Sequence, residues 1–122
     1  MTINKDYREW NVASQVNNPD SVFSYWKHML AFRKANTDVL VYGSYEPIEE
    51  SETGEMVLGY LRRCQYTGET IAVFLNFSDV QQTVIGDKYE EFESVAGNQE
   101  LRRSKDGSIV LAPFGAVVLK HR

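Results

Sequence analysis

The chain has 122 residues, of which 43% are hydrophobic and 25% are charged. This size and composition are typical of one compact globular domain and exclude a disordered or fibrous protein. Thirteen Lys and Arg residues against 17 Asp and Glu residues give a net charge of -4, which has the wrong sign for binding nucleic acid or an anionic lipid surface. We therefore expect no nucleic acid partner and no membrane partner.

Three features of the sequence bear on its location. No apolar stretch approaches the roughly 20 residues of a membrane-spanning helix. The N-terminus carries Asn4, Asp6 and Glu9 where a signal peptide is apolar. Cys64 is the only cysteine, which excludes an internal disulfide and favours a reducing compartment. Together these features predict a cytoplasmic protein.

The first predicted elements are an extended segment and a helix. Tyr7 and Trp10 lie in the first 17 residues without a clear period, which favours an extended segment. Asn18 and Pro19 are favoured residues at the start of a helix, and we predict one over residues 18–36. Apolar residues recur along it at i, i+4, i+7 and i+8 and form one face. This apolar stripe consists of Val22, Trp26, Met29 and Leu30.

After Thr37 the sequence changes to short segments rich in Val, Ile, Tyr and Phe, separated by turn residues, as in antiparallel strands. The run 71–75 is apolar on both faces, which predicts a central strand. Lys105-Asp106-Gly107 predicts a tight hairpin turn, and Thr67-Gly68 another. The predicted strands are residues 40–46, 56–63, 70–76, 82–85, 89–95, 100–103, 108–111 and 116–120.

These elements predict a mainly β fold: an antiparallel β-sandwich of about eight strands preceded by one amphipathic helix. Residues 1–38 are expected to hold the extended segment and the helix, and residues 39–122 the sandwich. The sequence contains no internal repeat and no flexible linker.

Carboxylates that could act as general acid and base occur in two groups. Glu49, Glu50, Glu52 and Glu55 lie among Ser, Thr and Gly residues, as in an exposed hairpin loop. In the second group, alternation along a predicted strand places Glu91 and Glu93 on one face and Glu90 on the other. Solvated surface is the favoured interpretation of both groups.

The remaining polar candidates are isolated. His28 lies on the polar flank of the predicted helix and His121 at the chain end, so we interpret both as surface histidines and expect no metal site. Cys64 has no evident base nearby and is predicted to be a packed thiol. Asn76-Phe77-Ser78 matches a glycosylation acceptor pattern, but in a cytoplasmic chain it would only mark a strand end.

Aromatic residues make up 12% of the chain. Stacked aromatic rings can hold sugars, but such residues more often fill cores and seams between elements, which is the interpretation we favour here. The aromatic residues concerned are Tyr7, Trp10, Tyr25, Trp26, Tyr42, Tyr45 and Tyr60.

An ordered series of short motifs along the whole chain resembles the C-terminal end of the α-glucosidases, the maltase and oligo-1,6-glucosidase branch of the α-amylase superfamily of glycoside hydrolases. In sequence, these motifs most resemble those of the fungal maltases. The motifs are Ile3-Asn4-Lys5-Asp6-Tyr7, Asn11-Val12-Ala13-Ser14-Gln15, Asn18-Pro19-Asp20-Ser21-Val22, Leu30-Ala31-Phe32-Arg33-Lys34, Val41-Tyr42-Gly43-Ser44-Tyr45, Val73-Phe74-Leu75-Asn76-Phe77-Ser78 and Leu111-Ala112-Pro113-Phe114-Gly115-Ala116.

The resemblance implies a parent enzyme with a catalytic (β/α)8 barrel followed by an antiparallel sandwich. The predicted helix is then similar to the last helix of the barrel. The family's nucleophile, acid/base and stabilising carboxylates lie on earlier barrel strands. None of the three falls in this chain, so the resemblance assigns no catalytic residue here. We also expect no cofactor and no metal.

The first hypothesis is therefore a non-catalytic C-terminal fragment of an α-glucosidase that hydrolyses terminal α-linked glucose with retention. The alternatives are a stand-alone carbohydrate-binding sandwich and a small interaction protein. The expected partner is the catalytic barrel, which would cover the apolar stripe of Val22, Trp26, Met29 and Leu30. Without it, we expect the stripe to be hidden by self-association, or by Tyr7 and Trp10 folding over it.

Overall fold

The computed structural model describes residues 2–122 and separates the chain into two compact units, one ending at Ala35 and the other spanning Asn36–Arg122. Two helices form the first unit, α1 (Val12–Gln15) and α2 (Val22–Ala35). Among the described residues, no helix is both long enough and apolar enough to cross a bilayer.

Residues 5–17 form turns and a short helix rather than an extended segment, so that prediction was wrong for this part of the chain. Residues 5–9 form turns and α1 follows them. Asn11 organises this segment: its Nδ2 donates to the carbonyl oxygens of Tyr7 at 3.1 Å and Arg8 at 3.0 Å, and its Oδ1 accepts from the Ser14 N–H at 2.9 Å. Short polar side chains that bond to nearby backbone favour turns and helix caps over extended chain, and the apolar period does not report this.

The predicted helix is present as α2, but it begins at Val22 rather than at Asn18. Residues 18–21 form a turn in which the Ser21 N–H donates to the Asn18 carbonyl oxygen at 3.2 Å. The Ser21 Oγ then accepts from the Ser24 N–H at 3.2 Å, which is the bond that a helix N-cap makes. Ser21 therefore starts the helix, and Asn18 and Pro19 belong to the turn before it.

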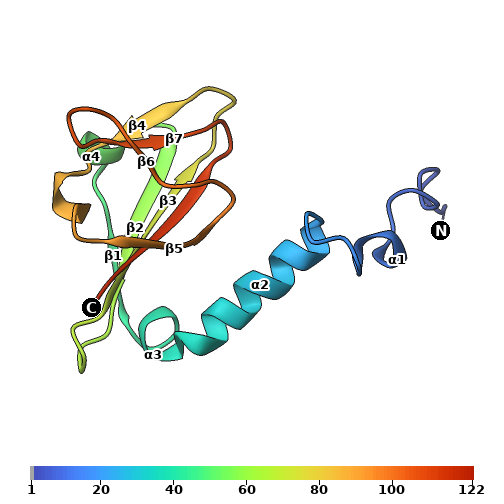
Figure 1. The fold of residues 1–122 in the computed structure, drawn as a ribbon, viewed down its shortest axis with the longest axis horizontal. Helices are drawn as coiled ribbons and strands as arrows, with labels where there is room; N and C mark the ends of the chain where they lie inside the picture. The colour runs from blue at the N-terminus through green and yellow to red at the C-terminus, as the bar shows by residue number, and fades with distance from the viewer. Residues whose placement is uncertain (1) are drawn as a thin grey trace. The chain divides into compact units, whose positions relative to one another are not determined.

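The Asn36–Arg122 unit contains two antiparallel sheets that face each other (Figure 1). The five-stranded sheet has the order β1-β2-β3-β8-β5: β1 (Ser44–Pro47), β2 (Val57–Arg63), β3 (Thr70–Asn76), β8 (Ala116–His121) and β5 (Glu93–Gly97). The three-stranded sheet has the order β4-β7-β6: β4 (Gln82–Val84), β7 (Ile109–Leu111) and β6 (Arg102–Arg103). Short helices lie between strands: α3 (Thr37–Leu40), α4 (Glu50–Thr53) and the 3-10 helix η1 (Asp87–Tyr89). The predicted mainly β fold with one preceding amphipathic helix is confirmed.

The core of this unit lies between the two sheets, and β3 is at its centre. Six of the seven β3 residues are buried, so both faces of the strand are covered, as the run 71–75 predicts. Phe74 meets the Tyr89 ring edge-on, with 5.1 Å between ring centroids. Both sheets contribute to the buried cluster, which consists of Val57, Ala72, Phe74, Val84, Tyr89, Ile109, Leu111, Val117 and Leu119.

Two predicted strands begin several residues too early. In place of the start of strand 40–46 the chain forms α3, and β1 begins only at Ser44. The Arg62 side chain donates to the carbonyl oxygens of Val39 at 3.4 Å and Val41 at 3.2 Å, which stabilises the end of α3. In place of the start of strand 89–95 the chain forms η1 and a turn, because the Tyr89 ring packs into the core. Both corrections depend on contacts distant in sequence.

Both turn predictions are confirmed. Gly107 has a φ of 85° and Gly68 a φ of 75°, the left-handed conformation that glycine adopts without a steric penalty. Asp106 Oδ1 also accepts from the Ser108 N–H at 3.1 Å, which fixes the turn between β6 and β7.

Candidate functional site

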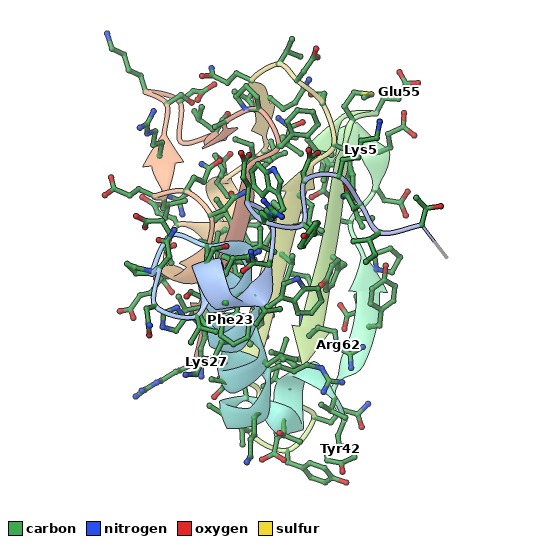
Figure 2. The ribbon with its side chains drawn as sticks, turned by 90° about the vertical axis from the view of Figure 1, so that its right-hand side faces the viewer. Lys5, Phe23, Lys27, Tyr42, Glu55 and Arg62 are labelled. Atoms are coloured by element: carbon green, nitrogen blue, oxygen red, sulfur yellow. The ribbon has the colours of Figure 1, made fainter. Side chains whose placement is uncertain are left out.

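The apolar stripe on α2 is the largest unexplained feature of the first unit. Val22 is 67% exposed, Trp26 61% and Leu30 57%, and no residue of α2 is buried. Figure 2 shows Phe23 and Lys27 projecting from the same helix. The spacing is that of a helix face buried against another element, yet within residues 2–35 only Met29 of the stripe is partly covered. The stripe is therefore a surface available to a partner.

Tyr7 and Trp10 do not cover the stripe, so that prediction was wrong. Trp10 and Trp26 are both well exposed, and Tyr7 is half exposed. The turn that Asn11 holds together, through its bonds to the Tyr7 and Arg8 carbonyl oxygens, keeps the two aromatic residues in a local structure of their own. Full burial of a large apolar side chain contributes about 1.5–3 kcal/mol, so covering the stripe would yield several kcal/mol.

The charges around the stripe are basic. α2 carries Lys27, Arg33 and Lys34 and no Asp or Glu. The chain up to Ala35 has five Lys and Arg residues against three Asp and Glu residues, whereas the rest has eight against fourteen. A partner that covers the stripe is therefore expected to be apolar at its centre and acidic at its rim.

The sequence predicted that the first acidic group lies in an exposed loop, and the structure shows a short helix there instead. Residues 50–53 fold into α4, which buries Thr53. The Glu52 carboxylate pairs with Lys88 Nζ at 2.7 Å, while Glu49 and Glu50 are exposed. Figure 2 shows Glu55 at the edge of the molecule. The solvated interpretation holds for the exposed members, and Glu52 has a structural role.

The second acidic group does not lie on one strand. Glu90 and Glu91 belong to the turn after η1, and only Glu93 is in β5. Glu91 Oε2 lies 3.5 Å from His121 Nε2, and the His121 ring packs on Phe92 with 5.1 Å between centroids. Glu91, Glu93 and His121 line an open hollow of about 620 Å³.

The other polar candidates are His28 and Cys64, and neither lies in a group of metal-binding side chains among the described residues. His28 is exposed and lies in a second hollow with Val16 and Lys27. Cys64 is buried, which confirms the packed thiol. Hydrogen bonds from the Thr67 hydroxyl, and then from the backbone N–H groups of Thr67 and Tyr66, lower the pKa of this thiol. Within residues 2–122, no three His, Cys, Asp or Glu side chains are grouped as metal ligands.

Asn76 does mark the end of β3, as predicted. Its side chain is buried, and its Nδ2 donates to the carbonyl oxygens of Val80 at 2.8 Å and Ala112 at 2.9 Å. A glycan could not be attached to an amide nitrogen enclosed in this way.

The prediction that the aromatic residues fill core and seams fails for several tyrosines. Tyr42 is 78% exposed and Tyr45 is half exposed. Tyr66, which the prediction did not include, is 97% exposed. Tyr45 contacts Tyr60, with 5.4 Å between ring centroids. Figure 2 shows the Tyr42 ring at the outer edge of the molecule. The composition of the chain does not distinguish these residues from core aromatics, because exposure depends on where the loops fold.

Comparisons with known proteins identify relatives of one kind. No family model matches the chain. The α-glucosidase of Schizosaccharomyces pombe is 28% identical over 129 residues, covering 98% of this chain and 20% of that protein. The oligo-1,6-glucosidase of Bacillus cereus is 32% identical over 126 residues, covering 98% of this chain and 21% of that protein. The chain thus spans about a fifth of the length of these curated relatives.

A solved structure gives the same result at the level of the fold. A mutant of isomaltulose synthase from Erwinia rhapontici NX5 superposes with a TM-score of 0.79 and 26% identity, covering 98% of this chain and 21% of that chain. The similarity therefore includes both units, within a protein about five times as long.

Proposed function

Because the chain is homologous to the C-terminal part of the α-glucosidases and oligo-1,6-glucosidases of the α-amylase superfamily, we propose that it is a non-catalytic part of such an enzyme. In this proposal residues 1–38 provide the last helix of the catalytic (β/α)8 barrel, and residues 39–122 form the C-terminal sandwich. The observation that carries the proposal is the apolar stripe, which has the spacing of a buried helix face and is exposed here. The barrel is the partner that would cover it.

The proposed parent enzyme hydrolyses terminal α-linked glucose with retention of configuration. In that reaction a carboxylate attacks the anomeric carbon while a carboxylic acid about 5 Å away protonates the departing glycosidic oxygen. Water then hydrolyses the covalent glucosyl-enzyme. This chain supplies neither group in the proposal. Its contribution is to cover the barrel strands with Trp26 and its neighbours and so hold the catalytic carboxylates in place. A cytoplasmic location and an origin in a fungal maltase are further parts of the proposal.

A chimera tests the role of the stripe. This chain would replace the matching fifth of the S. pombe α-glucosidase, and hydrolysis of a chromogenic α-glucoside would be measured with the soluble yield. We expect an active chimera. Trp26→Glu places a charge in the stripe and should lower soluble activity at least about tenfold, because burying an unpaired charge is costly. His28→Glu, which adds the same charge at an exposed position on the polar flank of the same helix, is the control.

The proposal makes two claims that could fail separately. If the Trp26→Glu chimera kept the activity and melting temperature of the parent chimera, the stripe would not be a barrel contact. The isolated chain should not hydrolyse the chromogenic α-glucoside. Turnover that follows the purified chain through every column would contradict the non-catalytic assignment.

The same stripe also favours self-association when no barrel is present. The exposed side chains of Val22, Trp26 and Leu30 could pack against a second copy of the helix. Sedimentation velocity should then show a concentration-dependent dimer that Trp26→Glu converts to a monomer. A parent chain that is monomeric at every concentration tested would rule this out.

A further inference from the structure

A hollow of about 370 Å³ lies in the Asn36–Arg122 unit between the end of α3 and the hairpin that joins β2 to β3. Gly43, Ser44 and Cys64, which are partly or fully buried, line it together with four exposed residues that we call its rim: Asp38, Tyr42, Gln65 and Tyr66. The volume falls within the range of roughly 300–1,000 Å³ that is typical of small-molecule sites. We call it the tyrosine hollow.

The backbone under the tyrosine hollow is held firmly on both sides. On the α3 side, Arg62 donates to two carbonyl oxygens, those of Val39 and Val41. On the hairpin side, the Gly68 N–H donates to the Cys64 carbonyl oxygen at 2.9 Å. The two sides also approach closely: a Cβ on Gly43 would lie 2.3 Å from the Val39 carbonyl oxygen and 2.7 Å from that of Arg63. The backbone of the hollow therefore keeps its conformation without a ligand, which lowers the part of the entropic cost of binding that comes from ordering the backbone.

The side chains on the rim, in contrast, are all exposed. Tyr42 and Tyr66 are the two most exposed of the exposed large hydrophobic residues. Among the ion pairs of residues 2–122, none includes the Asp38 carboxylate. The hollow at the end of β8 differs, because His121 there pairs with Glu91.

The chemistry of the rim fits a neutral sugar. A carboxylate accepts hydrogen bonds from hydroxyl groups, and an amide both donates and accepts them. Tyrosine rings offer flat apolar surface to the C–H face of a pyranose. The rim has one carboxylate and no cationic side chain, which disfavours a phosphate or carboxylate ligand.

We propose that the tyrosine hollow is an accessory site for a glucosyl ring of an α-linked oligosaccharide, with Tyr42 and Tyr66 stacking on the sugar and Asp38 and Gln65 bonding to its hydroxyl groups. The choice of α-linked glucose rests on the proposed function; the fit to a sugar rests on the rim alone. Such a site would hold substrate chains close to the enzyme without taking part in hydrolysis.

Titration of the full 122-residue chain with maltotriose, followed by amide NMR, tests the proposal. We expect saturable shifts at residues 38–44 and 64–68, with a Kd on the order of 1 mM, as for an open and shallow site. Tyr42→Ala and Tyr66→Ala should each raise the Kd about tenfold, the effect of losing one aromatic contact. Phe77→Ala removes an exposed ring at the other end of β3 and is the control.

Three outcomes would overturn the proposal. They are the absence of saturable shifts at these residues, unchanged binding in both tyrosine variants, and equal binding of β-linked cellotriose. Thermal melts of the variants should match the parent, because neither ring is packed in the core. The titration does not involve the barrel, so its failure would leave the chimera result standing, and failure of the chimera would leave the titration interpretable.

Discussion

Removal of the Asn76 side chain should be among the most damaging single changes to the sandwich. Asn76 is 4% exposed, and its amide joins three segments. Nδ2 donates to the carbonyl oxygens of Val80 at 2.8 Å and Ala112 at 2.9 Å. Oδ1 accepts from the Ser78 N–H at 2.9 Å and from the Ser78 Oγ at 2.7 Å. The segment after β3 and the segment after β7 are thus connected through one side chain.

Asn76→Ala leaves the Ser78 N–H without its partner. The Ser78 hydroxyl and the carbonyl oxygens of Val80 and Ala112 each lose a bond but keep another, because the Ser78 hydroxyl also donates to the Val80 carbonyl oxygen and the Gly115 N–H donates to that of Ala112. A buried polar group that loses its partner costs about 1–3 kcal/mol, and each further lost bond costs about 0.5–1.5 kcal/mol. We therefore expect the free energy of unfolding to fall by about 3 kcal/mol. At about 4–8 °C per kcal/mol for a unit of this size, the melting temperature should fall by about 15 °C.

Asn98→Ala is the matched control for this prediction. Asn98 also makes two side-chain bonds to backbone, donating to the Phe114 carbonyl oxygen at 3.0 Å and accepting from the Ala116 N–H at 2.7 Å, but it is exposed. Water can replace these bonds, so the loss should stay below about 1 kcal/mol. Urea unfolding followed by circular dichroism measures both variants. If Asn76→Ala proved as stable as Asn98→Ala, the argument from buried unsatisfied groups would be refuted.

Three other predictions concern the sandwich. Hydrogen bonds, first from the Ser104 hydroxyl, lower the pKa of Asp106. The unfolding free energy that Asp106 adds is therefore present above its unfolded pKa of about 3.9 and lost as pH falls below it, and Asp106→Asn should flatten the pH dependence of urea midpoints there. Buried Cys64 should react with a thiol reagent only as fast as the unit opens, and immediate native-state reaction would contradict its burial. Gly43→Ala should cost more than about 2 kcal/mol in thermal melts, because its Cβ would overlap the backbone, whereas Gly68→Ala, in open space, should cost about 1 kcal/mol for its left-handed φ.

The parts of the fold that were predicted correctly depend on local sequence. The run 71–75 is apolar on both faces wherever it is placed, so a central strand follows from the residues themselves. Asp106-Gly107 likewise determines its turn, because glycine adopts the positive φ that the turn needs. The resemblance to the C-terminal part of the α-glucosidases is confirmed for the same reason: motif order is a property of the sequence.

The parts that were missed depend on contacts between distant segments. Val39 and Leu40 have strand-forming composition, but Arg62 stabilises the helical end of α3 from another part of the chain. Tyrosine is common in strands, so the sequence predicts a strand at Tyr89. In the structure its ring packs in the core beside Phe74, and the backbone there forms η1 instead of a strand. The exposure of Tyr42 could not be predicted either, because it follows from the turn that α3 creates.

The apolar stripe on α2 was predicted correctly from the sequence, but most of its side chains are exposed. The spacing of apolar residues predicts that Trp26 and its neighbours form a helix face that packs against another element, but it does not identify that element. Within the described residues this face remains exposed, while the core residues of the sandwich, such as Ile109 and Leu111, are fully covered. A chain under selection only to fold alone gains nothing from Val22, Trp26 and Leu30 at exposed positions, because polar residues there would be more soluble. In the proposed function the stripe is the surface that the catalytic barrel covers, and the basic residues Lys27 and Arg33 on the same helix favour an acidic rim on that surface.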